Sequence, residues 1–161
     1  MNTVCSLPIS TTMLLRRSIN SEERFPRPEV PETWSLDYIS VSSGSQTVPT
    51  ATVRLKHSSK KDGGLQQDAS IGDGPVDAAL KAMDRIMKTR GKLMDYQLRA
   101  VSEGKDALGE VTVKVDFGDG ELVTGKAAST DVIEGSARAY LNAVNRFLGN
   151  SKPRVAKGSK P

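Results

Sequence analysis

An internal repeat constrains the fold of this chain more than any other feature of its sequence. Val41–Gly44 and Thr52–Leu55 recur as Val101–Gly104 and Thr112–Val115, which is an offset of 60 residues (101 − 41). In each copy a turn rich in small residues follows, and then an Ala-rich helical pattern. A strand–helix unit of this size cannot easily bury its apolar face alone. The two copies are therefore predicted to pack against each other, with a seam between them that suits a small ligand.

Each copy reads as three strands joined by short turns. Residues 60–64 and 117–120 combine Gly with polar residues and are typical of hairpin turns. The predicted strands are 36–41, 51–57 and 65–71 in the first copy and 93–101, 109–115 and 121–127 in the second.

A helical pattern follows the third strand of each copy. The first helix is predicted to start at Pro75 with Asp73 as its N-cap and to end at Gly91. The second is predicted to be capped by Ser129 or Thr130. The expected buried stripes are Val76, Ala79, Leu80, Met83, Ile86 and Met87 in the first helix and Ile133, Ala137, Tyr140, Leu141, Val144 and Leu148 in the second.

These patterns predict an α+β fold of two βββα units, each with an antiparallel three-stranded sheet covered by a helix. Unit one spans 34–91 and unit two spans 92–149, and together they form one domain at 34–149. Residues 1–33, with three closely spaced prolines, are predicted to be a disordered leader or linker, and 150–161 a disordered basic tail.

Charge and composition exclude several function classes. The net charge of +4 equals the four cations of the tail, so the rest of the chain is near neutral and a nucleic-acid groove is not supported. No apolar run is long enough to cross a membrane. One cysteine, Cys5, fits a reducing, cytoplasmic compartment. Arg16 and Arg17 in an acid-free leader give weaker support for organelle import.

No catalytic or metal-binding constellation is indicated. His57 is the chain's one histidine and has no Cys, Asp or Glu at ligand spacing, so we expect neither a metal nor a cofactor. The segment 120–126 has the Gly and Lys spacing of a phosphate-binding loop, but Ala127 stands where that loop needs Ser or Thr.

The starts of the two helices are the candidate ligand-binding features. Small residues at 72–75 and 128–131 leave backbone N–H groups free at the positive ends of the helix dipoles. The acids beside them, Asp73, Asp77 and Asp131, can receive an ammonium group. Donors and acceptors side by side favour a zwitterion over a phosphate.

Longer strings of the chain resemble the C-terminal regulatory domain of 2-isopropylmalate synthase. The strings are 72–79, which reads Gly-Asp-Gly-Pro-Val-Asp-Ala-Ala, then 95–107, and 129–146, which contains Ala-Tyr-Leu-Asn-Ala-Val-Asn. The resemblance covers roughly residues 34–149. It implies two βββα units related by a pseudo-two-fold axis, a homodimer, and binding of leucine as an allosteric ligand between the units.

The resemblance also implies which residues bind the effector. The carboxylate is expected on backbone N–H groups near Gly74–Asp77, and an apolar pocket with Tyr96 on its wall is expected to take the branched side chain. The expected effector-binding residues are Gly72, Asp73, Gly74, Pro75, Val76, Asp77, Leu93, Tyr96, Ala100, Ala107, Gly109, Ala128 and Ser129.

The chain departs from that family in one respect. Enzymes of the family carry a catalytic barrel with a metal held by an aspartate and two histidines, which this sequence does not contain. The expected partner is therefore a catalytic barrel in cis or in trans. Two alternatives stay open: an isoleucine-sensing domain of a citramalate synthase, and a fragment of the acyltransferase.

Overall fold

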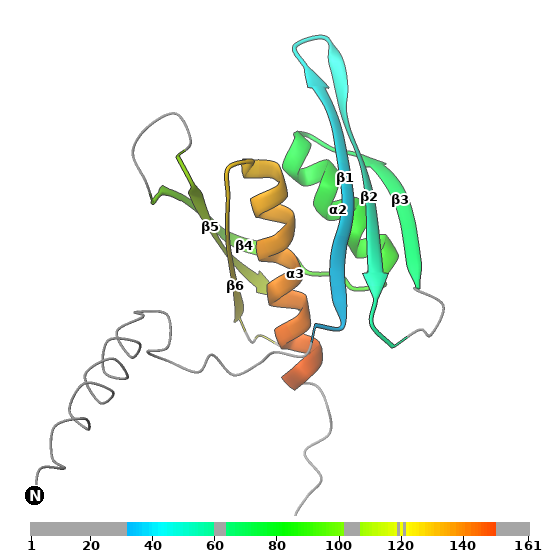
Figure 1. Cartoon of the computed structure of the whole chain (residues 1–161), viewed down its shortest axis with the longest axis vertical. Helices are drawn as coiled ribbons and strands as arrows, with labels where there is room; N and C mark the ends of the chain where they lie inside the picture. The colour runs from blue at the N-terminus through cyan, green and yellow to red at the C-terminus, as the bar shows by residue number, and fades with distance from the viewer. Residues whose placement is uncertain (1–31, 60–63, 102–106, 119, 121, 151–161) are drawn as a thin grey trace, which may run out of the picture.

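The computed structural model describes residues 32–59, 64–101, 107–118, 120 and 122–150. They form two antiparallel three-stranded sheets, each followed by a helix, so the predicted α+β fold of two βββα units is confirmed (Figure 1). The first sheet has the order β1-β2-β3 and the second the order β4-β5-β6. The elements are β1 (Trp34–Gly44), β2 (Thr47–His57), β3 (Leu65–Ile71), α2 (Pro75–Met87), β4 (Lys92–Ala100), β5 (Gly109–Asp116), β6 (Leu122–Ser129) and α3 (Val132–Asn150).

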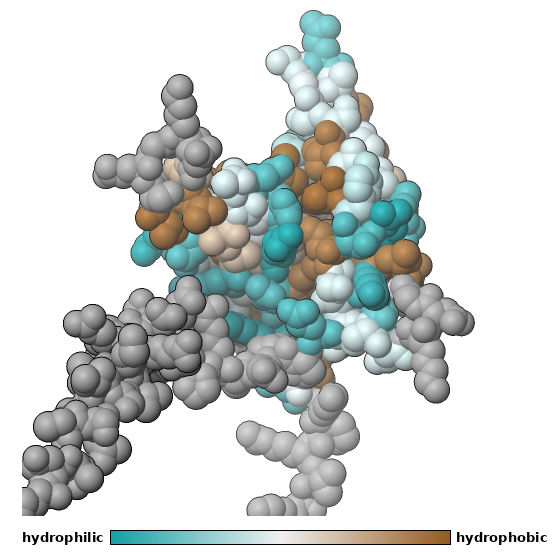
Figure 2. Space-filling model, viewed as in Figure 1, coloured by the Kyte–Doolittle hydropathy of each residue, from teal (hydrophilic) through white to brown (hydrophobic). Residues whose placement is uncertain are grey.

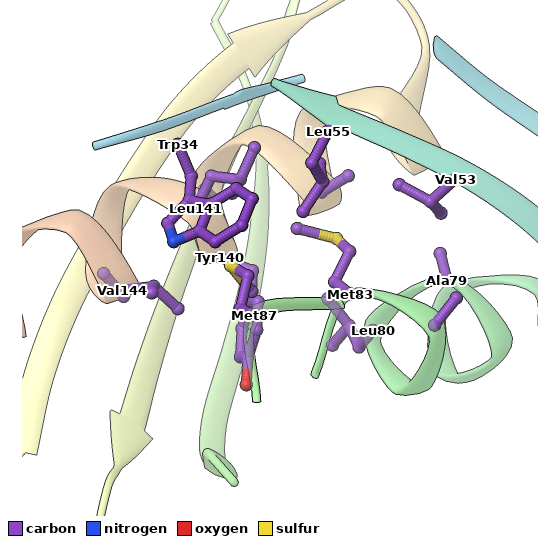
Figure 3. Packing of buried hydrophobic residues seen from close by; sticks show 14 of the residues in the cluster. Trp34, Val53, Leu55, Ala79, Leu80, Met83, Met87, Tyr140, Leu141 and Val144 are labelled. Carbon is purple, nitrogen blue, oxygen red and sulfur yellow. The ribbon is translucent and has the colours of Figure 1, made fainter. Parts of the chain in front are cut away.

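The central strand of each sheet supplies the core. Buried residues alternate along β2 and along β5, as expected for strands with one face against a helix. The buried residues are Ala51, Val53 and Leu55 in β2 and Val111, Val113 and Val115 in β5. They meet apolar side chains of both helices, as Figure 3 shows for Leu55 and Met83, so one core spans the two units.

The first helix starts at Pro75 as predicted, but the caps of both helices and the end of the first differ from the prediction. Gly74 is the N-cap of α2, and as a glycine it has no side chain that could bond to the first N–H groups of the helix. Asp73 does not cap the helix. The helix ends at Met87, and Lys88 adopts a left-handed conformation with φ 54°, so Gly91 does not terminate it. In α3, Asp131 Oδ1 accepts hydrogen bonds from the N–H groups of Ile133 and Glu134, so Asp131 is the cap.

The repeat is visible in matching strand irregularities and ion pairs. A bulge follows Leu36 in β1 and Leu93 in β4, and these residues pair with Leu55 and Val115. Residues of β1 and β4 are therefore equivalent at an offset of 57 (93 − 36). The helices share this offset, because the ion pairs Asp77–Lys81 in α2 and Glu134–Arg138 in α3 also differ by 57 (134 − 77).

The offset of 60 holds for β2 and β5 but not for the strands before them. Val41 pairs with Ala51, and the equivalent pair in unit two is Leu98 with Val111. Val101, which the repeat had matched with Val41, lies beyond the end of β4. The connection between β4 and β5 is longer than that between β1 and β2, which shifts the offset from 57 to 60.

The two units are not packed symmetrically. The helices α2 and α3 contact each other, and β1 packs against α3 of the other unit. The repeat would place β4 against α2 in the same way, but this contact is missing. Within the described residues, no Cα atom of β4 lies within 8 Å of a Cα atom of α2 or α3. One seam between the units is therefore closed, while the other, between α2 and β4, is open. The two seams are called the closed seam and the open seam below.

Candidate functional site

The open seam contains a cavity of about 520 Å³. One wall is a stripe of α2, the other is the start of β4, and Tyr140 from α3 closes the inner end. The lining residues are Val76, Asp77, Leu80, Lys81, Asp84, Gly91, Leu93, Tyr96 and Tyr140. A volume in this range is typical of small-molecule sites, which span about 300–1,000 Å³. The cavity is mostly apolar with a few charged groups, which is the usual lining of such a site.

The α2 wall begins with an ion pair between Asp77 and Lys81. Asp77 Oδ2 lies 2.7 Å from Lys81 Nζ and also accepts a hydrogen bond from the N–H of Asp73 at 3.0 Å. The hydrogen bond from Lys81 is the main reason that the pKa of Asp77 is lowered. The carboxylate of Asp77 therefore already occupies the start of the helix, where a ligand carboxylate was expected.

The β4 wall depends on the bulge after Leu93. Leu93 and Tyr96 are three residues apart, but they pair with Val115 and Val113, which both face the core. The bulge thus turns Leu93 and Tyr96 to the same face of the sheet. Tyr96 Oη lies 2.8 Å from Ser136 Oγ on α3, which fixes the ring against the second helix.

The inner end of the cavity is a polar junction between the two units. Tyr140 Oη donates a hydrogen bond of 2.5 Å to Asp84 Oδ1, and the N–H of Gly91 also bonds to Asp84. Burial raises the pKa of Asp84 to about 6, and these two donors offset part of that rise. The pKa of Tyr140 is raised, first by burial and then by the charge of Asp84.

Gly91 makes this junction sterically feasible. A Cβ atom on Gly91 would lie 2.4 Å from Tyr140 Oη and 2.6 Å from Val115 Cγ1, far inside normal contact distance. The glycine that the sequence suggested as a helix terminator therefore allows close approach of α3 and β5.

The structure brings together four of the residues expected to bind an effector: Val76, Asp77, Leu93 and Tyr96 all line this cavity. Gly72, Asp73, Gly74 and Pro75 lie next to it at the start of α2 but are not among its lining residues. Gly72 instead allows a close approach, since a Cβ there would lie 2.5 Å from the N of Ala78.

The remaining expected residues lie elsewhere. Ala100 and Gly109 pair with each other at the far end of the second sheet, and Ser129 pairs with Gly109. Ala107 precedes β5, and Ala128 lines a different cavity on the closed seam. None of these five residues lines the cavity of the open seam.

Five lining residues were missed by the sequence interpretation: Leu80, Lys81, Asp84, Gly91 and Tyr140. Helical spacing from Val76 and Asp77 could have indicated the first three, because positions three and four apart share a helix face. Gly91 lies between α2 and β4, and Tyr140 lies on α3, and the sequence carries no signal that places them here.

The closed seam holds a smaller cavity, of about 330 Å³, whose lining includes Trp34, Leu36 and Asn145. Asn145 locks this seam by accepting a hydrogen bond from the N–H of Trp34 and donating one to its carbonyl oxygen. The indole of Trp34 lies beside Leu141 of α3 (Figure 3).

Comparisons with known proteins identify the family of this chain. The family described as the LeuA allosteric (dimerisation) domain matches residues 14–148. The chain belongs to this family. It is 54% identical over 119 residues to a 2-isopropylmalate synthase of Methylacidiphilum infernorum, covering 74% of this chain and 23% of that protein. It is 48% identical over 132 residues to a 2-isopropylmalate synthase of Carboxydothermus hydrogenoformans, covering 82% and 25%. This LeuA-type domain thus spans about a quarter of the length of the curated relatives it matches.

Within the described ranges, no group of three His, Cys, Asp or Glu side chains is arranged to hold a metal ion. Neither of the two helices described has the length and apolarity needed to span a membrane.

Proposed function

We propose that this domain binds leucine in the cavity of the open seam and thereby controls a 2-isopropylmalate synthase to which it belongs or is bound. The observation that carries the proposal is the cavity itself, with an apolar wall of Val76, Leu80, Leu93 and Tyr96 beside charged groups of α2. An apolar wall takes the branched side chain, and burial of such a side chain contributes roughly 2 kcal/mol.

The location of the cavity suits regulation. It is bounded by α2 of unit one and by β4 and α3 of unit two, so a ligand there contacts both units. A ligand alters the geometry of a domain only if it binds one arrangement better than another, and the coupling is typically about 1–3 kcal/mol. We infer that leucine favours one relative placement of the two units, which a catalytic part of the synthase senses.

Calorimetric titration of the chain with leucine tests this function. We expect binding on the order of micromolar affinity. Isoleucine and valine belong in the same experiment, because a site selective for isoleucine would point to a citramalate synthase instead. The absence of both heat and thermal stabilisation with all three amino acids would refute the proposal.

We also propose that the domain forms a homodimer through the uncovered face of β4. Leu93, Tyr96 and Leu98 share the inner face of the second sheet, yet they are 37%, 36% and 48% exposed. Apolar surface is visible at the free end of β4 and β5 in Figure 2. Contiguous apolar patches of this kind typically mark interfaces, and the family is itself described by dimerisation.

Leu98→Lys tests the dimer by placing a charge on this face. Sedimentation analysis should show the variant as a monomer at concentrations where the unaltered chain is a dimer. Leu122→Lys is the matched control, because Leu122 is 53% exposed and pairs with Asp116 on the outer face of the same sheet. Dimers of unchanged stability in Leu98→Lys would contradict the assignment.

A further inference from the structure

The cavity of the closed seam is the repeat equivalent of the cavity in the open seam. It is bounded by β1 of unit one and by β6 and α3 of unit two, and its volume of about 330 Å³ suits a small ligand. Four pairs of lining residues in the two cavities correspond at the offset of 57: Trp34 with Gly91, Leu36 with Leu93, Arg138 with Lys81, and Leu141 with Asp84.

Two of these differences change the chemistry of the closed seam. Leu141, which is 3% exposed, stands where the open seam has the carboxyl group of Asp84. Arg138 lines the cavity without Glu134, its ion-pair partner, whereas both members of the equivalent pair of α2 line the open seam. The wall formed by α3 therefore presents a cation and no acid.

The two strands that flank this cavity add backbone donors. In each sheet the flanking strand, β1 or β6, is an edge strand with one free side. The N–H and C=O of Trp34 bond to Asn145 on that side, and the C=O of Lys126 bonds to Asn142. Because the backbone direction alternates along a strand, Leu36 and Ala128, which both line the cavity, direct their N–H groups to the same free sides.

Arg138 can bind a ligand without leaving its partner. Its Nη2 lies 2.5 Å from Glu134 Oε1 in an i,i+4 pair. A guanidinium carries five N–H donors and matches the geometry of a carboxylate, so donors remain for a second acceptor. The other charged residue among those that line the cavity is Glu32, which is exposed to solvent, where water and salt screen its charge.

We propose that the closed seam is a second ligand site, which binds a small aliphatic monocarboxylate that has no amino group. Arg138 and the N–H groups of Leu36 and Ala128 receive the carboxylate. The aliphatic end lies against Leu141 and the indole of Trp34. An ammonium group is disfavoured, because it would be desolvated beside a guanidinium with no acid on the wall of α3 to receive it.

Methyl NMR of the whole chain with three probes tests the proposal: 4-methylpentanoate, its neutral amide, and leucine. The signals of Leu36 and Leu141, which line the cavity, should respond to 4-methylpentanoate at a concentration about tenfold or more below that needed for the amide, because a hydrogen bond to a charged group contributes about that factor. Leucine should require a higher concentration than 4-methylpentanoate at these two residues. Equal responses to the acid and the amide would overturn the proposal.

Arg138→Gln removes the cation from the cavity. We expect this variant to need about tenfold or more 4-methylpentanoate to reach the same shift of Leu36 and Leu141. The pair that it breaks is exposed, so thermal unfolding should show a folded domain of nearly unchanged stability. An unchanged affinity for 4-methylpentanoate would overturn the role of Arg138.

Arg146→Gln is the matched control on the same helix. Arg146 donates to the C=O of Thr124 and does not line the cavity, so the same chemical change there should leave the response to 4-methylpentanoate unaltered. An equal loss of affinity in both variants would assign the effect to the charge of α3 and would overturn the site.

This site and the proposed function can fail separately. If leucine shifts Leu80 and Leu93 but 4-methylpentanoate leaves Leu36 and Leu141 unmoved, the proposed function stands and the second site is wrong. If 4-methylpentanoate shifts Leu36 and Leu141 in a manner that depends on Arg138, while leucine binds nowhere, the second site stands and the proposed function fails.

Discussion

Substituting Gly91 by alanine probes the junction that keeps the open seam open. The new Cβ would lie 2.4 Å from Tyr140 Oη and 2.6 Å from Val115 Cγ1, so the ring or β5 must move by roughly 1 Å to reach ordinary contact. Gly91 is not among the residues with positive φ, so no backbone strain is added and packing alone decides the effect.

The expected cost follows from two contributions. Overpacking of a close-packed region typically costs about 1–3 kcal/mol. If Tyr140 moves away, the half-buried carboxyl of Asp84 keeps only the N–H of Gly91, and a lost hydrogen bond to a charged group costs about 1.5–3 kcal/mol. Because the two costs share one displacement, they are not additive, and we expect a total loss of about 2–4 kcal/mol.

Urea unfolding at pH 7 measures this loss. Gly44→Ala is the control, because a Cβ on Gly44 meets only the end of a flexible side chain, Thr47 Oγ1, at 3.1 Å. A double-mutant cycle sharpens the test: Tyr140→Phe removes the atom at 2.4 Å, so it should be less damaging in the Gly91→Ala background than alone. A loss below about 1 kcal/mol, or additive effects in the cycle, would refute the reasoning.

Three other predictions concern stability. Because the pKa of Asp84 is 3.8 unfolded and about 6 folded, its protonation stabilises the fold fully below pH 3.8, and this contribution disappears as the pH rises through 6. Relative to Asp84→Asn, the unaltered chain should therefore lose at most about 3 kcal/mol of unfolding free energy between pH 4 and pH 7 in urea titrations. The loss will be smaller because part of the carboxyl is exposed to solvent. A difference in unfolding free energy between the two chains that does not change with pH would contradict this. Asn145→Ala leaves the buried N–H and carbonyl of Trp34 unpaired and should cost about 2–4 kcal/mol by thermal unfolding, whereas a loss below about 1 kcal/mol would mean that the closed seam is not locked there. Lys114→Ala breaks an exposed pair with Asp95 and should change stability by less than about 0.5 kcal/mol in the same assay; a larger loss would show that the pair is more than a surface contact.

The strand and helix content could be predicted because it depends on local patterns. The third strand was predicted at 65–71, as observed, since the segment lies between the Gly-containing turn at 60–64 and the helix start at Pro75. The helix caps could not, because several candidates compete within three residues. Asp131 caps α3 where Ser129 and Thr130 were expected, and the choice depends on tertiary geometry that the sequence does not encode locally.

The candidate site was predictable only on the wall formed by α2 and β4. Asp77 was expected from the helix start, and Val76, Leu93 and Tyr96 from the family resemblance. The odd spacing of Leu93 and Tyr96 becomes a shared face only through the bulge. Asp84 was missed because its partner Tyr140 is 56 residues away in the other repeat. A long-range hydrogen bond between repeats leaves no periodic signal in either one.

The central claim is that leucine occupies the open seam, and methyl NMR of the chain during titration with leucine tests it most directly. The account predicts that the methyl signals of Leu80 and Leu93, which line the cavity of the open seam, shift in proportion to bound ligand. The signals of Leu36 and Leu141, which line the cavity of the closed seam, should shift less than those of Leu80 and Leu93. Shifts confined to Leu36 and Leu141, or saturation with no shift of Leu80 and Leu93, would contradict it.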